Sequence, residues 1–228
     1  MLQIAPNLTD QVYDALVDEI CDGRLAPGRH LVQERLAERF GVSRQPIQQT
    51  MSRLKADGMV EEIGRRGLFV TRIDPARMLD NYGVRAALDG WAAKTAALRV
   101  SGNAELRDRV DAEGRALLEA AATAISAQDV AGLVKLDYAF HSQFYAASGN
   151  RLIVETAEPH WRFLRRAMGD VLRKAENPVE IWRQHRAILE AIVAGDATAA
   201  MELAEAHARD AALLLADALM RTEPEDRA

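Results

Sequence analysis

The stretch Gln33–Leu54, QERLAERFGVSRQPIQQTMSRL, decides the fold of the first third of this chain. Within it, Leu36, Ala37 and Phe40 recur at the spacing of one helix face and predict a short helix with one buried side. Gly41 follows at once, and glycine readily takes the left-handed backbone conformation that ends a helix. The first part of the stretch therefore predicts a short helix that stops at a tight turn.

A second helix is predicted directly after this turn. Ser43 is a good N-cap, and Pro46 falls in the first turn, where its missing N–H costs little. Ile47, Met51 and Leu54 share the buried face of this helix. The opposite face presents polar side chains, namely Arg44, Gln45, Gln48, Gln49 and Ser52. Such groups suit hydrogen bonds to base edges and phosphates, and two helices joined by a glycine-containing turn predict a helix-turn-helix.

A wing is predicted after the second helix. Met59–Val60 and Leu68–Val70 have the pattern of two short strands on either side of the sequence GRRG, and Leu31–Val32 is a candidate third strand. A hairpin with two arginines at its tip is how a winged helix presents a wing to DNA. The alternative is a small helical domain with a solvated arginine turn. The predicted DNA-binding residues are Arg35, Ser43, Arg44, Gln45, Gln48, Gln49, Arg65, Arg66 and Gly67.

The segment LAPGRHLVQERLAERFGVSRQPIQQTMSRLKADGMVEEIGRRGLFV resembles the winged-helix domain of GntR-type transcription regulators. The shared motifs are PG, L-x-x-x-x-LA, GVSR-x-P, L-x-x-x-G after the second helix, and RG-x-x-V in the wing. They occur in the family's order and spacing, and the resemblance covers residues 9–73. Members commonly carry Arg-Glu where this chain has Gln48 and Gln49. The resemblance therefore does not imply that this chain binds the family's usual operator sequence.

The overall composition favours closely packed helices, because 49% of the 228 residues are hydrophobic and only 5% are aromatic. The net charge is −5, but it is unevenly distributed. Arg35–Arg72 holds eight basic residues and four acidic ones, a net charge of +4 in the predicted DNA-binding segment. The single cysteine, Cys21, excludes an intramolecular disulfide framework and fits a reducing compartment. No signal peptide or membrane-length apolar run is found, so we expect a soluble cytoplasmic protein with no membrane partner.

The fold class is therefore predicted to be mainly α, with an N-terminal winged helix-turn-helix followed by an all-α bundle of six or seven helices. From residue 76 onward no segment has a strand pattern, and the predicted helices are 78–100, 104–126, 129–148, 151–173, 179–194 and 196–221. The predicted organisation is an arm (1–8), the winged helix-turn-helix DNA-binding domain (9–73), a linker (74–76), the all-α domain (77–221) and a tail (222–228).

Four ionisable residues fall on apolar helix faces of the bundle. Asp137 and His141 lie one turn apart, and His185 and His207 each lie within the apolar stripe of a later helix. Buried carboxylates and imidazoles need compensation, either from a hydrogen-bonded Asp–His network or from a metal. One carboxylate and three imidazoles suit a divalent transition metal ion, with Zn, Ni, Mn and Fe all possible. Three arginines, Arg162, Arg165 and Arg166, are expected on a solvated face.

Residues 77–220 resemble the FCD domain, the ligand-sensing domain of the FadR-like branch of GntR regulators. The matching stretches are RAALDGWAAKTAA, DYAFHSQFYAASGN, WRQHRAILEAIVAGDATAA and AEAHARDA. Metal-binding members use an Asp and a His one turn apart plus two later His residues, which implies the ligands Asp137, His141, His185 and His207. The resemblance also implies that Arg85 binds an effector carboxylate, whereas an intrahelical pair with Asp89 is the simpler alternative. Asp89 itself departs from the glutamate usual at that position.

These features predict a metabolite-responsive transcription regulator that binds operator DNA as a homodimer and senses a small carboxylate at a metal site. The family's commoner mode, repression relieved by ligand, implies a repressor. One alternative is a metal-dependent enzyme with a DNA-binding appendage, but no general base stands beside the ligands and no HExxH motif is present. The other is a DNA-binding protein whose bundle only dimerises.

Overall fold

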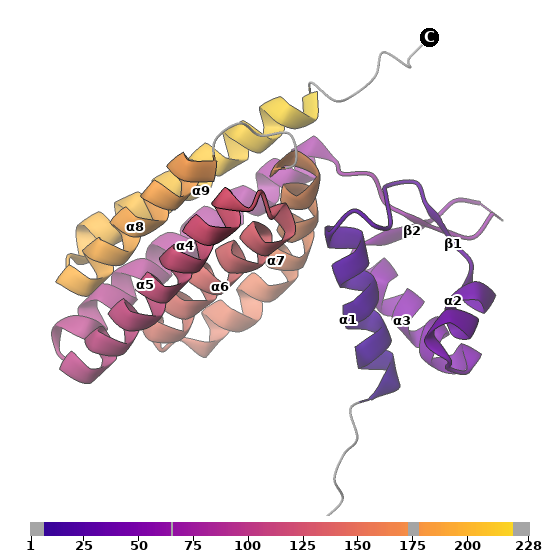
Figure 1. The fold of residues 1–228 in the computed structure, drawn as a ribbon, viewed down its shortest axis with the longest axis horizontal. Helices are drawn as coiled ribbons and strands as arrows, with labels where there is room; N and C mark the ends of the chain where they lie inside the picture. Colours follow the sequence, from indigo (N-terminus) through magenta and orange to yellow (C-terminus); the bar gives the residue numbers. More distant parts are fainter. Residues whose placement is uncertain (1–6, 65, 173–177, 221–228) are drawn as a thin grey trace, which may run out of the picture. The chain divides into compact units, whose positions relative to one another are not determined.

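The computed structural model describes residues 7–64, 66–172 and 178–220, and the chain divides into two compact units between Ile73 and Asp74. The first unit contains three helices and three strands within the described residues (Figure 1). Their bounds are α1 (Leu8–Cys21), β1 (His30–Leu31), α2 (Gln33–Phe40), α3 (Arg44–Ala56), β2 (Val60–Glu62) and β3 (Leu68–Val70).

The turn between α2 and α3 has the geometry that the sequence predicts. Gly41 ends α2 with a φ of 64°, and the N–H of Val42 donates to the carbonyl oxygen of Ala37 at 3.1 Å. Ser43 holds the N-cap position of α3, but its side chain makes no capping hydrogen bond. Helix α1 is capped by Asn7, whose side chain accepts a hydrogen bond from the Thr9 N–H. The positions of α2 and α3 were thus predicted correctly, but the capping side chain of Ser43 was not.

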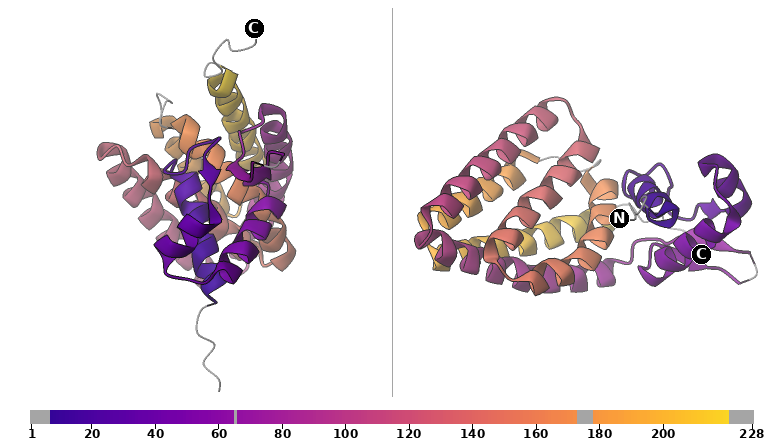
Figure 2. Two further views of the ribbon diagram at one scale, coloured as in Figure 1. Left: turned by 90° about the vertical axis from the view of Figure 1, so that its right-hand side faces the viewer. Right: turned by 90° about the horizontal axis from the view of Figure 1, so that it is seen from below.

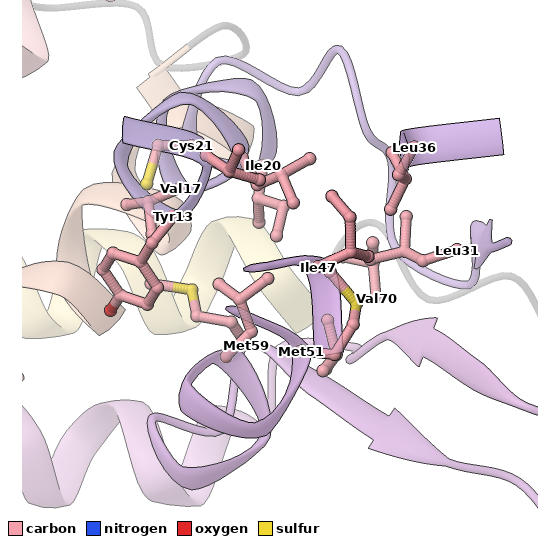
Figure 3. Packing of buried hydrophobic residues seen from close by; sticks show 14 residues of the cluster. Tyr13, Val17, Ile20, Cys21, Leu31, Leu36, Ile47, Met51, Met59 and Val70 are labelled. Atoms are coloured by element: carbon pink, nitrogen blue, oxygen red, sulfur yellow. The ribbon is translucent and has the colours of Figure 1, made fainter. Parts of the chain in front are cut away.

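One apolar cluster joins the helices of the first unit to its sheet. Figure 3 shows side chains from the helices and strands pointing toward one another, and Leu16, Ile47 and Leu54 are completely buried. Cys21 belongs to this cluster. Because α1 and α3 pack on each other, the polar face of α3 is directed away from the core.

The sheet has the order β1-β3-β2 with antiparallel pairing throughout, so the wing hairpin β2–β3 is extended by β1. His30 of β1 stacks on Phe69 of β3 with ring centroids 4.6 Å apart. Gly67, just before β3, has a φ of 103°, and a Cβ there would lie 2.8 Å from His30 Nε2. Only glycine fits this position without displacing the histidine ring.

The second unit consists of six helices within its described residues, which confirms the predicted all-α bundle. They are α4 (Pro75–Ser101), α5 (Ala104–Ser126), α6 (Val130–Ser148), α7 (Arg151–Leu172), α8 (Pro178–Ala194) and α9 (Ala197–Met220). Residues 74–76, expected to be a linker, instead begin α4. Asp74 is its N-cap and accepts from the Ala76 N–H, while Pro75 occupies the first turn. No helix in the described part of the chain is both long and apolar enough to cross a membrane.

Helix α4 is the central element of the bundle, because it packs against each of the other five helices. Its longest contact is with α9, which lies beside it in both views (Figures 1 and 2). Small side chains allow this close approach: Ala93 and Ala97 of α4 and Ala204 and Ala208 of α9 are completely buried. The polar residues that α4 carries inward are therefore placed in the middle of the unit.

Candidate metal centre

Three helices aim four ionisable side chains at one point inside the bundle. Helix α6 provides Asp137 and His141 one turn apart, α8 provides His185, and α9 provides His207. All four side chains are buried, and one ligand atom from each lies within 4.8 Å of the others. The structure therefore brings together the set of residues that the sequence indicated.

The three separations that involve His185 are those of neighbouring ligands around a single ion. His185 Nε2 lies 3.1 Å from His207 Nε2, 3.3 Å from His141 Nε2 and 3.2 Å from Asp137 Oδ1. Ligands held at about 2.1 Å from one metal ion lie about 3.0 Å apart in octahedral geometry and about 3.4 Å apart in tetrahedral geometry. The three measured separations lie between these two values.

The protons available to this cluster cannot satisfy its acceptors. His207 Nδ1 lies 2.8 Å from Gln184 Oε1, so this nitrogen carries the hydrogen and Nε2 presents a lone pair. His141 Nδ1 faces Asp89 Oδ2 at 3.2 Å, although imperfectly aligned for a hydrogen bond, which also favours a lone pair on Nε2. His185 Nε2 carries at most one proton for its three neighbours. A cation at the point of convergence would satisfy these lone pairs, that of His141 once the Arg85 Nη2 hydrogen bond to it is given up, so the donor set fits a metal ion.

Asp89 of α4 connects several of the buried polar groups. Its completely buried carboxylate accepts from Arg85 Nε at 3.1 Å and from the Tyr145 hydroxyl, and it faces His141 Nδ1. The Tyr145 oxygen in turn accepts from Trp161 Nε1 at 3.0 Å. A carboxylate behind a metal-ligating histidine fixes the tautomer and raises the basicity of the ring. Sequence reasoning had assigned Asp89 only to Arg85, and its contact with His141 was missed.

Arg85 lies between Asp89 and the cluster, and its predicted role toward an effector carboxylate stays a prediction. It forms the intrahelical pair with Asp89, and it also reaches the cluster, because its Nη2 donates to His141 Nε2 at 2.7 Å. Its guanidinium lies over the Trp161 ring, 4.1 Å from the centroid, and Nη2 is 3.9 Å from Asp137 Oδ2. Its Nη1 is buried and makes no hydrogen bond with a described residue. Arg85 therefore occupies the lone pair of His141 that a metal ion would need.

Burial and the neighbouring charges set the protonation of the site. Burial, reinforced by the charge of Arg85, lowers the pKa of His141 to about 4, although Asp89 opposes this shift. Burial likewise lowers the pKa of His207 well below its ordinary value. Burial alone would raise the pKa of Asp137, but His185 and Arg85 outweigh it and hold that pKa below its usual range. His141 and His207 are thus neutral and Asp137 ionised at neutral pH, as metal ligation requires.

A cavity of about 750 Å³ opens beside the cluster. Asp137 and His207 line its inner end together with Tyr82 of α4, whereas Arg85, His141 and His185 do not line it. The cluster thus has an inner side, closed by the Asp89 network, and an outer side that faces the cavity. A small molecule in the cavity would approach the ion from the side of Asp137 and His207.

The predicted DNA-binding residues lie on the surface of the first unit. The exposed ones are Arg35, Ser43, Arg44, Gln45, Gln48, Gln49 and Arg66. Arg44 lies 3.7 Å from Glu34 in an exposed ion pair. Gln49 accepts from the Thr9 hydroxyl at 2.8 Å, a contact that leaves its amide N–H groups unused. Gly67 is half-buried under His30, and Arg65 lies outside the described residues.

The expected solvated face on α7 was wrong for one of its three arginines. Arg166 is 2% exposed, while Arg162 and Arg165 are half-buried. The physical reason is that α7 packs against α4, α6 and α9, which buries a wider arc of the helix than its apolar stripe alone indicates.

Comparisons with known families cover both units. Residues 8–70 match the family described as bacterial regulatory proteins, gntR family, and residues 80–210 match the FCD domain. The HTH-type transcriptional regulator in unstable DNA locus of Streptomyces ambofaciens is 31% identical over 200 residues, which cover 87% of this chain and 80% of that protein. The HTH-type transcriptional repressor RspR of Escherichia coli K12 is 29% identical over 94 residues, 41% of each chain.

Solved structures share the fold at lower sequence identity. Escherichia coli McbR/YncC superposes with a TM-score of 0.79 at 21% identity, covering 93% of this chain and 99% of that one. A GntR regulator from Rhodococcus sp. RHA1 superposes with a TM-score of 0.77 at 20% identity, covering 95% and 99%. These similarities extend over both units, so the pairing of a winged helix with this helical bundle is shared.

Replacing Asp89 tests whether it supports the metal ligands. Asp89→Asn removes the charge behind His141 and should lower Zn²⁺ affinity by about 10- to 100-fold, the usual effect of losing such a partner. The dissociation constant is measured by competition with a chromophoric chelator, with circular dichroism as a check on folding. Asp108→Asn, an exposed carboxylate of α5 paired with Arg107, is the matched control and should not change the affinity. Equal affinities for Asp89→Asn and the control would show that Asp89 does not support the site.

Proposed function

The chain belongs to the GntR family of bacterial regulatory proteins and carries an FCD domain, and we propose that it is a repressor whose FCD domain senses a small carboxylate at a bound metal ion. Family membership makes it a DNA-binding transcription regulator and not an enzyme. Its place of action is then the cytoplasm, where bacterial operator DNA lies. The metal, the effector, the repressor role and the homodimer are the parts that we propose.

The observation that carries the metal proposal is the convergence of Asp137, His141, His185 and His207 at ligand–ligand distances. These residues would hold a divalent transition metal ion such as Zn, Ni, Mn or Fe. When bound, the ion supplies a Lewis-acidic position for an anionic oxygen. Four protein ligands leave room for one or two further donors on an ion of higher coordination number, and the cavity beside Asp137 and His207 gives access to them.

The position of Arg85 supports a carboxylate as the effector. The lone pair of His141 Nε2 serves either the Arg85 guanidinium or a metal ion, but not both. A bound metal would therefore release Arg85 Nη2, next to an Nη1 that already has no hydrogen-bond partner among the described residues. Two N–H groups on one guanidinium form the fork that binds carboxylates. Metal binding would thus free Arg85 for the effector. Arg85 does not itself line the cavity, so the carboxylate would have to reach it past Tyr82, whose ring centroid lies 5.4 Å from the guanidinium carbon.

Helix α4 provides the route from the effector to the DNA. It begins at Pro75, immediately after the division between the two units, and it carries both Arg85 and Asp89. Effector binding at Arg85 acts directly on the helix that continues the chain from the winged helix. We propose that a shift of α4 changes the arrangement of two DNA-binding units in a homodimer and releases the operator.

The first experiment concerns the operator. Arg44→Ala should weaken operator binding by about 1–3 kcal/mol if the guanidinium contacts a base. Arg66→Ala should reduce the slope of log affinity against log salt concentration by about one, as expected when one phosphate contact is lost. Fluorescence anisotropy with labelled operator at several salt concentrations measures both effects. Arg107→Ala removes the same charge from the second unit and is the control. Operator affinity unchanged by both Arg44→Ala and Arg66→Ala would refute the assigned DNA face.

An apolar stripe on α4 supports the homodimer. Val84, Trp91 and Leu98 recur every seven residues and are 43%, 53% and 57% exposed. Large apolar side chains in a row on the surface are typical of a protein interface, and a two-fold dimer matches the two half-sites of a palindromic operator. We propose that this stripe packs on the same stripe of a second copy.

Charge placed on the stripe should therefore dissociate the dimer. Trp91→Asp should convert the protein to monomer at micromolar concentration, as measured by sedimentation equilibrium, because the interface would bury an unpaired carboxylate. Leu152→Asp is the matched control, since Leu152 is an exposed leucine of α7 outside the stripe and its replacement should leave the dimer intact. A monomeric unsubstituted protein, or a dimeric Trp91→Asp variant, would contradict the proposed interface.

Removing one ligand separates sensing from DNA binding. His185→Ala should lose the stoichiometric metal and its stabilisation against heat, because α8 would no longer be tied to α6 and α9. Operator binding should persist, but small carboxylates should no longer release the DNA. Metal content is measured by mass spectrometry, release by anisotropy, and His160→Ala, whose ring is half-buried and bonded to Asn81, is the control. If metal-free His185→Ala protein still released the operator fully when small carboxylates were added, the bundle would sense them without a metal ion, which would contradict the proposal.

A further inference from the structure

We propose that the effector is a monocarboxylate with an apolar body and without a second anionic group. This inference rests on the proposed function, because it names the ligand class of the same metal-linked site. It follows from the chemistry of the cavity, which changes from its inner end to its mouth. Each part of the cavity selects one part of the ligand.

The inner end of the cavity is suited to one carboxylate group. Asp137 and His207 bring the metal position to the cavity wall, and Tyr82 lines the same cavity. The Tyr82 hydroxyl is buried beside Arg85 and forms no well-aligned hydrogen bond with a described residue. Burial raises the pKa of this phenol, so the hydroxyl remains a hydrogen-bond donor. A carboxylate oxygen bound at the metal position would be a suitable acceptor for it.

The middle of the cavity is apolar. Its wall is formed by side chains from four helices, chiefly Leu133, Met168, Ile181, Trp182, Leu214 and Leu215. A ligand body lying there loses its water, and the indole N–H of Trp182 is the one conventional hydrogen-bond donor among these six side chains, so most hydroxyl or carboxyl groups on it would remain unsatisfied. Alkyl or aryl groups instead gain by burial. A cavity of about 750 Å³ has the size of sites for ligands larger than acetate or lactate.

The mouth of the cavity carries negative charge. Glu180 and Asp210 line it with the neutral amides of Gln128 and Gln184, and the described lining contains no lysine or arginine. Glu180 is paired with Arg183, whereas the partner of Asp210 in the wall is Gln184, whose amide donates at 3.1 Å. A second carboxylate on the ligand would meet Asp210 without a compensating cation among the described lining residues, and like charges repel. The mouth therefore disfavours dicarboxylates and tricarboxylates.

The test compares two acids that differ only in the second carboxylate. Octanoate and octanedioate are titrated calorimetrically into zinc-loaded protein, and octanoate should bind at least about tenfold more tightly, because the dianion meets an uncompensated like charge. Asp210→Lys, a charge reversal at an exposed position, should improve octanedioate binding at least about tenfold while changing octanoate binding by less than about threefold. Octanedioate binding as tightly as octanoate to the unsubstituted protein would overturn the proposal.

Acetate distinguishes this inference from the proposed function. Acetate that binds zinc-loaded but not metal-stripped protein supports the metal-linked carboxylate site, and a preference for octanedioate would then refute only the ligand class. Octanoate that binds equally with and without zinc would refute the metal link while supporting the apolar ligand. If neither acetate nor octanoate binds zinc-loaded protein, both proposals fail. Leu214→Ala should weaken octanoate but not acetate, since only the longer acid reaches the apolar wall.

Discussion

The interior of the helical bundle depends on one buried carboxylate, that of Asp89 on α4. It is completely removed from water, and it compensates the guanidinium of Arg85 while it faces the ring of His141. A buried charge without partners would be very costly, so these contacts must form together for the bundle to be stable. The result is a prepared interior in which His141, His185 and His207 direct Nε2 at one point.

This constraint explains why sensing is assigned to the centre of the fold. Helix α4 packs on all the other helices of the unit, and α9 approaches it closely because both helices present alanines at their contact. A change in the charge at the cluster therefore acts on α4, the helix that directly follows the winged helix in the chain. The same helix bears the exposed Trp91 stripe, so one element links the effector, the second protomer and the DNA-binding unit in our proposal.

The sequence predicted more of the fold than of the site. Helical periodicity located α5 at its observed bounds, Ala104–Ser126, and Gly41 correctly marked the turn of the helix-turn-helix. Periodicity also identified the four inward-facing ionisable residues, because it reports which face of a helix is apolar. It could not reveal that Asp89 faces His141 or that Gln184 holds His207, since such contacts depend on how separate helices are rotated and packed. For the same reason it misplaced Arg166.

The central claim is that the buried cluster holds one metal ion that ties α6, α8 and α9 together. X-ray absorption spectroscopy at the zinc edge on zinc-loaded protein tests it most directly. We expect one ion per chain, with three imidazole nitrogens and a carboxylate oxygen at about 2.0–2.2 Å. A spectrum without imidazole scattering, or one unchanged by His185→Ala, would place the ion elsewhere and leave the four residues as a hydrogen-bonded core network.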